Sequence, residues 1–148
     1  MRQFGSYRIG FDICGLVLFL LVMIPNLLWF AVPAPNDILR SASATPNIDV
    51  IASVLQALLV ATLCFVIPID RPTNRRFTVG IAVLVFAYFV GWVTYYLGFT
   101  HAVIILDLCI APCLAFLLFS VARQNWIAAL FTIGFLIFHT LYGIINFL

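Results

Sequence analysis

The chain has 148 residues, of which 66% are hydrophobic and only 8% are charged, and its formal net charge is +2. Soluble domains carry about 25% charged residues, and one of this size could not bury so much apolar surface. The composition therefore excludes a soluble globular domain, and the few scattered charges exclude a nucleic-acid-binding surface.

Five apolar stretches are each long enough to cross a bilayer, which takes about 20 helical residues. Membrane β-strands would be about 10 residues long and alternate in polarity, so these longer runs predict helices. We expect the helices at residues 9–32, 49–69, 77–98, 102–122 and 126–148. The sequence thus predicts an all-α integral membrane protein with a single transmembrane domain, residues 1–148, folded as a compact five-helix bundle.

The first stretch follows Arg2 and Arg8, as the core of a secretory signal peptide would. A signal core has only about 7–15 apolar residues, whereas this run extends over residues 9–32. Pro33 and Pro35 also stand where a cleavage site would lie. We therefore expect an uncleaved first span.

The arginines lie mostly on one side of the predicted membrane. Six of the seven precede the first helix or lie in the second and fourth connections, and only Arg40 lies in the first connection. The six are Arg2, Arg8, Arg71, Arg75, Arg76 and Arg123. Because positive residues stay in the cytoplasm, the N-terminus is predicted to be cytoplasmic and the C-terminus outside. The expected location is the cell (inner) membrane, as a multi-pass protein.

The longest connection, residues 33–47, is therefore predicted to be external. Its segment "NDILR" indicates a short turn at the membrane interface. Asn47, with Asp49 two residues later, indicates the cap of the second helix. The loop serves either as a flexible lid or as a plain connector.

Small and polar residues share one side of the last helix when residues are placed about 100° apart. They are Ala128, Thr132, Phe135, His139, Gly143 and Asn146. In membranes, small residues mark helix contacts, and polar groups lie there because lipid cannot satisfy them. We therefore expect this side to face the protein.

The other helices show comparable stripes, which we also expect to face inward. The first helix aligns Asp12, Gly15, Phe19, Met23 and Asn26, and the second aligns Ser53, Gln56, Ala57, Val60 and Cys64. The third helix aligns Gly80, Ala87, Gly91, Thr94 and Gly98.

Each helix also carries a polar group in its outer half, within about 14 Å of the external surface at 1.5 Å per residue. The candidate ligand-binding residues are Asn26, Gln56, Tyr95, Asp107, His139, Tyr142 and Asn146. An ionised Asp within a bilayer costs about 2.5–3.5 kcal/mol, so we expect Asp107 and His139 to approach one another. In the structural alternative, Asp107 caps local backbone and His139 bonds a carbonyl.

Pro25 and Pro112 lie beside these polar groups. Broken helices next to polar residues line binding sites in transporters. The alternative is that both prolines are ordinary kinks of membrane helices.

Signatures of catalysis or metal binding are missing from the sequence. The four cysteines form no CxxC pair and are expected to pack as small apolar residues. The two histidines form no HExxH motif, and neither a GxSxG motif nor a glycine-rich phosphate loop occurs. We expect no catalytic residue, no metal and no cofactor.

Several short motifs resemble a family of small uncharacterised bacterial integral membrane proteins. The segments are "MIPNLLWF", "VIPI", "IAPCLAFLLFS" and "FHTLYGIINF". The matching positions are Pro25, Asn26, Pro68, Pro112, His139, Gly143 and Asn146. The family has a Glu and a Gly-Arg pair in its second helix, where this chain has Val54, Leu55 and Gln56. The resemblance implies the five-helix fold and the set Asn26, His139 and Asn146, but no activity.

The leading functional expectation is a non-enzymatic protein. It would bind a small polar ligand or a lipid head group in an outer-facing pocket, or act as an accessory subunit. The first alternative is a proton-coupled transporter, working as a homo-oligomer with Ala87 and Gly91 at one contact. The second is an intramembrane enzyme with His139 as base and Asp107 as orienting acid. The expected partners are the lipid bilayer and a second copy of the chain, with no nucleic acid.

Overall fold

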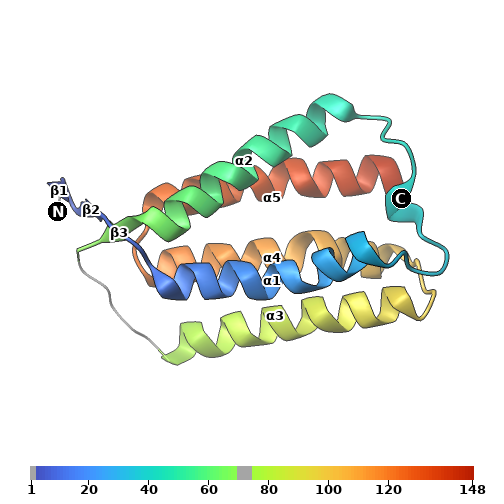
Figure 1. Ribbon diagram of the computed structural model, residues 1–148, viewed down its shortest axis with the longest axis horizontal. Helices are drawn as coiled ribbons and strands as arrows, with labels where there is room; N and C mark the ends of the chain where they lie inside the picture. Colours follow the sequence, from blue (N-terminus) through green and yellow to red (C-terminus); the bar gives the residue numbers. More distant parts are fainter. Residues whose placement is uncertain (1–2, 70–74) are drawn as a thin grey trace.

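The computed structural model describes residues 3–69 and 75–148, and in these ranges it has five long helices and a small sheet (Figure 1). The helices are α1 (Ile13–Ala31), α2 (Pro46–Phe65), α3 (Arg75–Tyr96), α4 (Ala102–Ala122) and α5 (Trp126–Phe147). All five are long and apolar enough to cross a membrane, which confirms the prediction of five long apolar helices. Arg2 and Arg71, on which the predicted orientation partly depends, lie outside the described residues.

Helix α4 forms the centre of the bundle and is the most buried of the five. It packs between α3 and α5, α2 packs on α5, and α1 lies against α2, α3 and α4 (Figure 1). Pro25 and Pro112 are buried inside α1 and α4, and both helices continue through them. The broken-helix alternative for these two prolines is therefore wrong.

Three short strands form a sheet at one end of the bundle: β1 (Gln3–Phe4), β2 (Tyr7–Ile9) and β3 (Val66–Pro68). They are antiparallel in the order β1-β2-β3, and Gly5 adopts the positive φ of +59° that the turn between β1 and β2 requires. The amide of Asp12 then donates to the Cys64 carbonyl over 2.8 Å.

This pairing explains why two predicted helix boundaries are wrong. The first helix begins at Ile13 rather than residue 9, and the second ends at Phe65 rather than residue 69. The extended segments bond to each other instead of continuing as helices. The Asp12 side chain caps α1 by accepting from the amide of Cys14 over 3.0 Å.

The buried face of α5 matches the prediction. Ala128, Thr132, Phe135 and Gly143 are buried, while Leu130 is 67% exposed. The small-residue side of α5 thus faces the bundle together with Phe135, and Leu130 points away from it, as the stripe predicted.

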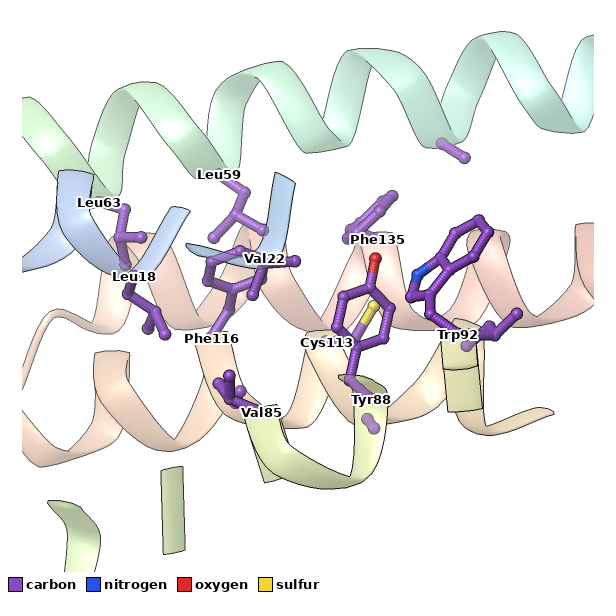
Figure 2. Packing of buried hydrophobic residues seen from close by; sticks show 14 of the residues in the cluster. Leu18, Val22, Leu59, Leu63, Val85, Tyr88, Trp92, Cys113, Phe116 and Phe135 are labelled. Atoms are coloured by element: carbon purple, nitrogen blue, oxygen red, sulfur yellow. The ribbon is translucent and has the colours of Figure 1, made fainter. Parts of the chain in front are cut away.

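The predicted inward stripe of α2 is only partly correct. Of its members, Cys64 is buried and Gln56 and Val60 are half-buried, whereas Ser53 and Ala57 are exposed. Leu59 and Leu63 fill much of the contact of α2 with its neighbours (Figure 2), and the small residues Ala52 and Cys64 are buried beside them.

The stripe on α3 is only partly correct, because the aromatic residues Tyr88, Trp92 and Tyr95 occupy the buried face. Figure 2 shows Tyr88 and Trp92. Gly91 is also buried, and a Cβ there would collide with the carboxylate of Asp107 on α4. Gly91 therefore serves the contact between α3 and α4 within one chain, and it is not available for the expected homo-oligomer contact.

The two ends of the bundle differ in charge, and we name them accordingly. The arginine end carries the sheet together with Arg8, Arg75, Arg76 and Arg123. The loop end carries the connection between α1 and α2, Arg40 and the C-terminus (Figure 1).

Candidate functional site

The long connection at the loop end is organised by Asp37. Its Oδ1 accepts from the indole Nε1 of Trp29 over 3.0 Å and from the hydroxyl of Tyr95 over 2.8 Å. Its Oδ2 accepts from Nε of Arg40 over 3.0 Å. The expected turn at "NDILR" is confirmed as η1 (Ile38–Arg40), which begins directly after this carboxylate.

The surroundings of Asp37 favour its ionised form. Burial on its own would raise the pKa of this carboxyl, but hydrogen bonds from Trp29, Tyr95 and Ala34 and the charge of Arg40 together lower it below 3.8. Arg40 also lies over the Trp29 ring, 4.9 Å from its centroid, and donates to the Trp29 carbonyl. Asp37 therefore acts as a charged clamp between α1, α3 and the loop.

Asn146 fastens the same loop at a second point. Its Oδ1 accepts from the amide of Ala44 over 2.7 Å, and its Nδ2 donates to Oγ1 of Thr45 over 2.6 Å. Thr45 precedes α2, which begins with Pro46, so the predicted cap at Asn47 is wrong.

Two predicted ligand-binding residues are thus engaged by the loop itself. Tyr95 is fully buried, donates to Asp37 and accepts from the amide of Leu39 over 3.2 Å. Asn146 holds Ala44 and Thr45. In this conformation, the loop is a pinned cover over the helices below it.

A cavity of about 220 Å³ lies beneath this cover, between α1, α3, α4 and α5. Three of the seven predicted site residues, Asn26, His139 and Tyr142, line it together. The other lining residues are Trp29, Leu39, Trp92, Ile105, Leu108, Cys109 and Phe147. The sequence thus located part of the site but not its aromatic walls, because Trp29 and Trp92 read as ordinary apolar residues.

Each polar side chain around the cavity is held in place by a different kind of contact. Nδ2 of Asn26 donates to the Tyr88 hydroxyl over 2.6 Å, which ties α1 to α3. The ring of His139 stacks on Phe135 with centroids 4.8 Å apart. The indole N–H of Trp92 is buried and has no acceptor with hydrogen-bond geometry among the described residues, although the Tyr88 hydroxyl lies near it (Figure 2).

Trp92 also separates this cavity from a second hollow. That hollow has a volume of about 280 Å³ and lies between α1 and α3, with Pro25, Leu28 and Phe89 in its walls. One indole ring therefore stands between the cavity and an apolar recess on the side of the bundle.

Asp107 does not join His139. Its carboxylate lies against Gly91 on α3, and no hydrogen bond or ion pair between Asp107 and His139 occurs in the described part of the chain. The expected approach is wrong because Leu108 and Cys109, not Asp107, occupy the cavity side of α4.

Gln56 lies neither in the cavity nor at the loop clamps. It faces an open groove of about 480 Å³ between α1 and α2, together with Phe19, Met23 and Ser53. Of the seven predicted residues, Asn26, His139 and Tyr142 line the cavity, and Tyr95 and Asn146 hold the loop. Asp107 lies at the contact of α4 with α3, and Gln56 faces the groove between α1 and α2.

Three of the four cysteines pack in the interior as predicted. Cys64, Cys109 and Cys113 are buried, whereas Cys14 is exposed, and Sγ of Cys109 would lie 2.6 Å from a Cβ placed on Gly143. Within residues 3–69 and 75–148, no three His, Cys, Asp or Glu side chains come together as metal ligands would.

Comparison of the chain with protein-family models, with curated proteins and with solved structures finds no match. The resemblance to a bacterial membrane-protein family therefore stays a prediction.

Proposed function

We propose that this chain is a multi-pass inner-membrane protein that binds a small, neutral ligand in the cavity at its loop end. The positive-inside rule places the arginine end in the cytoplasm and the cavity near the outer surface. The binding is non-enzymatic, with Asn26, His139, Tyr142 and Trp92 as the polar contacts.

The main observation in support of this proposal is the buried indole N–H of Trp92. Buried donors in native proteins nearly always have an acceptor with good geometry, and the nearby Tyr88 hydroxyl, which already accepts from Asn26, does not offer that geometry to Trp92. A carbonyl or ether oxygen of a ligand in the cavity would supply such an acceptor. The second hollow on the far side of Trp92 offers the ligand an apolar approach from the bilayer.

The size and lining of the cavity define the class of ligand. A cavity of about 150 Å³ holds one benzene ring, so about 220 Å³ holds a single ring with a polar substituent. None of the lining residues is an Asp, Glu, Arg or Lys, which favours a neutral molecule. Two tryptophans in the walls favour a flat one.

Two isosteric probes test this proposal. Acetophenone has a carbonyl acceptor, and 2-phenylpropene has a methylene group in its place. We expect acetophenone to raise the melting temperature of the detergent-solubilised protein more than 2-phenylpropene does, because bound ligand stabilises the folded state. Trp92→Phe keeps an aromatic ring but removes the donor, so it should abolish the difference between the two probes.

The matched control is Trp126→Phe. Trp126 is 59% exposed at the arginine end, far from the cavity, and its loss should leave the preference for acetophenone unchanged. Equal shifts with both probes in the unmodified protein, or a preference that survives Trp92→Phe, would contradict the proposed site.

A further inference from the structure

An apolar groove of about 380 Å³ opens between α1, α3 and α4 toward the arginine end. Its α1 wall is one face of the helix, formed by Ile13, Val17 and Leu21 at intervals of four residues. At 1.5 Å per residue, these residues extend over about 12 Å along the helix. The groove therefore runs parallel to the helices, from the arginine end into the bundle.

Positive charge surrounds the mouth of this groove. Arg123 lines it, and its guanidinium lies 5.3 Å from the ring centroid of Phe119, another lining residue. Arg75 and Arg76 are exposed at the start of α3, directly before the lining residue Phe77. The apolar part of the groove thus ends where the cationic side chains begin.

Arg123 keeps donors for a further partner. Its Nη1 lies 3.7 Å from Oδ2 of Asp12, and the Arg123 side chain is 20% exposed. A guanidinium has five N–H donors in a planar fork, so one distant carboxylate does not exhaust them. Phosphate is the anion whose geometry this fork fits.

We propose that this groove binds one acyl chain of an anionic phospholipid, with the lipid phosphate at Arg123. In a bilayer, the groove lies at the depth of the acyl chains, and an empty one would lose contacts along its whole length. The lipid stands with its head group at the arginine end, where the cytoplasmic leaflet carries anionic lipid. This inference rests on the membrane insertion proposed above and is independent of the ligand in the loop-end cavity.

Native mass spectrometry of the intact, detergent-solubilised chain tests the site. The probes are phosphatidylglycerol and phosphatidylcholine with the same dioleoyl chains. We expect retention of one phosphatidylglycerol in preference to phosphatidylcholine. Arg123→Gln should lower this preference about fivefold, the effect of one arginine near an anionic lipid surface. Arg40→Gln, the same change of charge at the loop end, should leave it unaltered.

Two further variants examine the charge and the groove separately. Asp12→Asn preserves a good helix cap but removes the competing carboxylate, so the preference for phosphatidylglycerol should increase. Val17→Trp fills the groove and should reduce retention of both lipids. Equal retention of the two lipids, a preference that survives Arg123→Gln, or undiminished lipid in Val17→Trp would overturn the proposal. Resistance to alkaline carbonate extraction tests membrane insertion itself, so the two failures can be told apart.

Discussion

The two ends of the bundle are held together by different kinds of contact. At the arginine end, the backbones of α1 and α2 are in close contact. A Cβ on Gly15 of α1 would lie only 2.7 Å from the carbonyl oxygen of Leu63 on α2. The amides of Gly10 and Asp12 bond to carbonyls of the same segment of α2. At the loop end, α1 and α2 diverge, and the groove containing Gln56 opens between them (Figure 1).

Side chains replace these backbone contacts at the loop end. Asp37 binds the loop to α1 and α3, and Asn146 binds it to α5. Backbone contacts fix two helices closely, whereas side-chain clamps can be released one at a time without unfolding a helix. The difference places the proposed ligand cavity under the part of the molecule that can open most easily.

Two asparagines make this comparison testable. Asn125, directly before α5, makes its contacts at the arginine end, and Asn146, within α5, makes its contacts at the loop end. At the arginine end, Asn125 is 3% exposed, and its Nδ2 donates to the carbonyls of Val66 over 2.8 Å and Thr62 over 3.1 Å. Its Oδ1 caps α5 by accepting from the amide of Ala128 over 3.1 Å. Asn146 at the loop end is half-buried.

The largest effect is expected for Asn125→Ala. The change removes the side-chain donor to the Val66 and Thr62 carbonyls, of which Thr62 keeps the amide of Val66, and it removes a helix cap. Together these losses should lower the free energy of unfolding by about 3 kcal/mol. Thermal unfolding in detergent would measure it. Gln124→Asn, in the exposed neighbour, is the control and should change stability by less than about 0.5 kcal/mol. A loss below about 1 kcal/mol for Asn125→Ala would show that this end does not depend on the buried amide.

A smaller effect is expected for Asn146→Ala. The loop groups that it releases can bond to water, so the loss should be about 1 kcal/mol. Hydrogen exchange should increase in residues 41–45 and stay unchanged in β2 and β3. If Asn146→Ala cost as much as Asn125→Ala, the contrast between the two ends would be wrong.

The smallest effect on stability is expected when the pH is lowered. Because hydrogen bonds and Arg40 lower the pKa of Asp37 below 3.8, its ionised form stabilises the folded state at pH values above 3.8. This contribution is lost as the pH falls below 3.8 toward the lowered pKa. The melting temperature of the unmodified protein should therefore approach that of Asp37→Asn as the pH is lowered from neutral to below 3.8. A constant difference across this range would contradict the charged clamp.

The sequence by itself determined the number and type of the long elements. The length of an apolar run predicts a long helix, and α4 covers the predicted residues 102–122. The inward face of α5 was also predictable, because Ala128, Thr132 and Gly143 lie on one side of the helix and are buried. The same reasoning located Asn26, His139 and Tyr142, which share the cavity.

Only the tertiary structure decided which residues meet. The strands at residues 3–9 and 66–68 are too short to show a pattern, and they form because two distant segments supply each other's hydrogen bonds. The inward faces of α2 and α3 depend on the bulk of leucine and aromatic side chains against particular neighbours. Counting residues along the helices could place Asp107 and His139 at a similar depth. Depth does not show in which direction a side chain points around its helix axis, and Asp107 on α4 points toward Gly91.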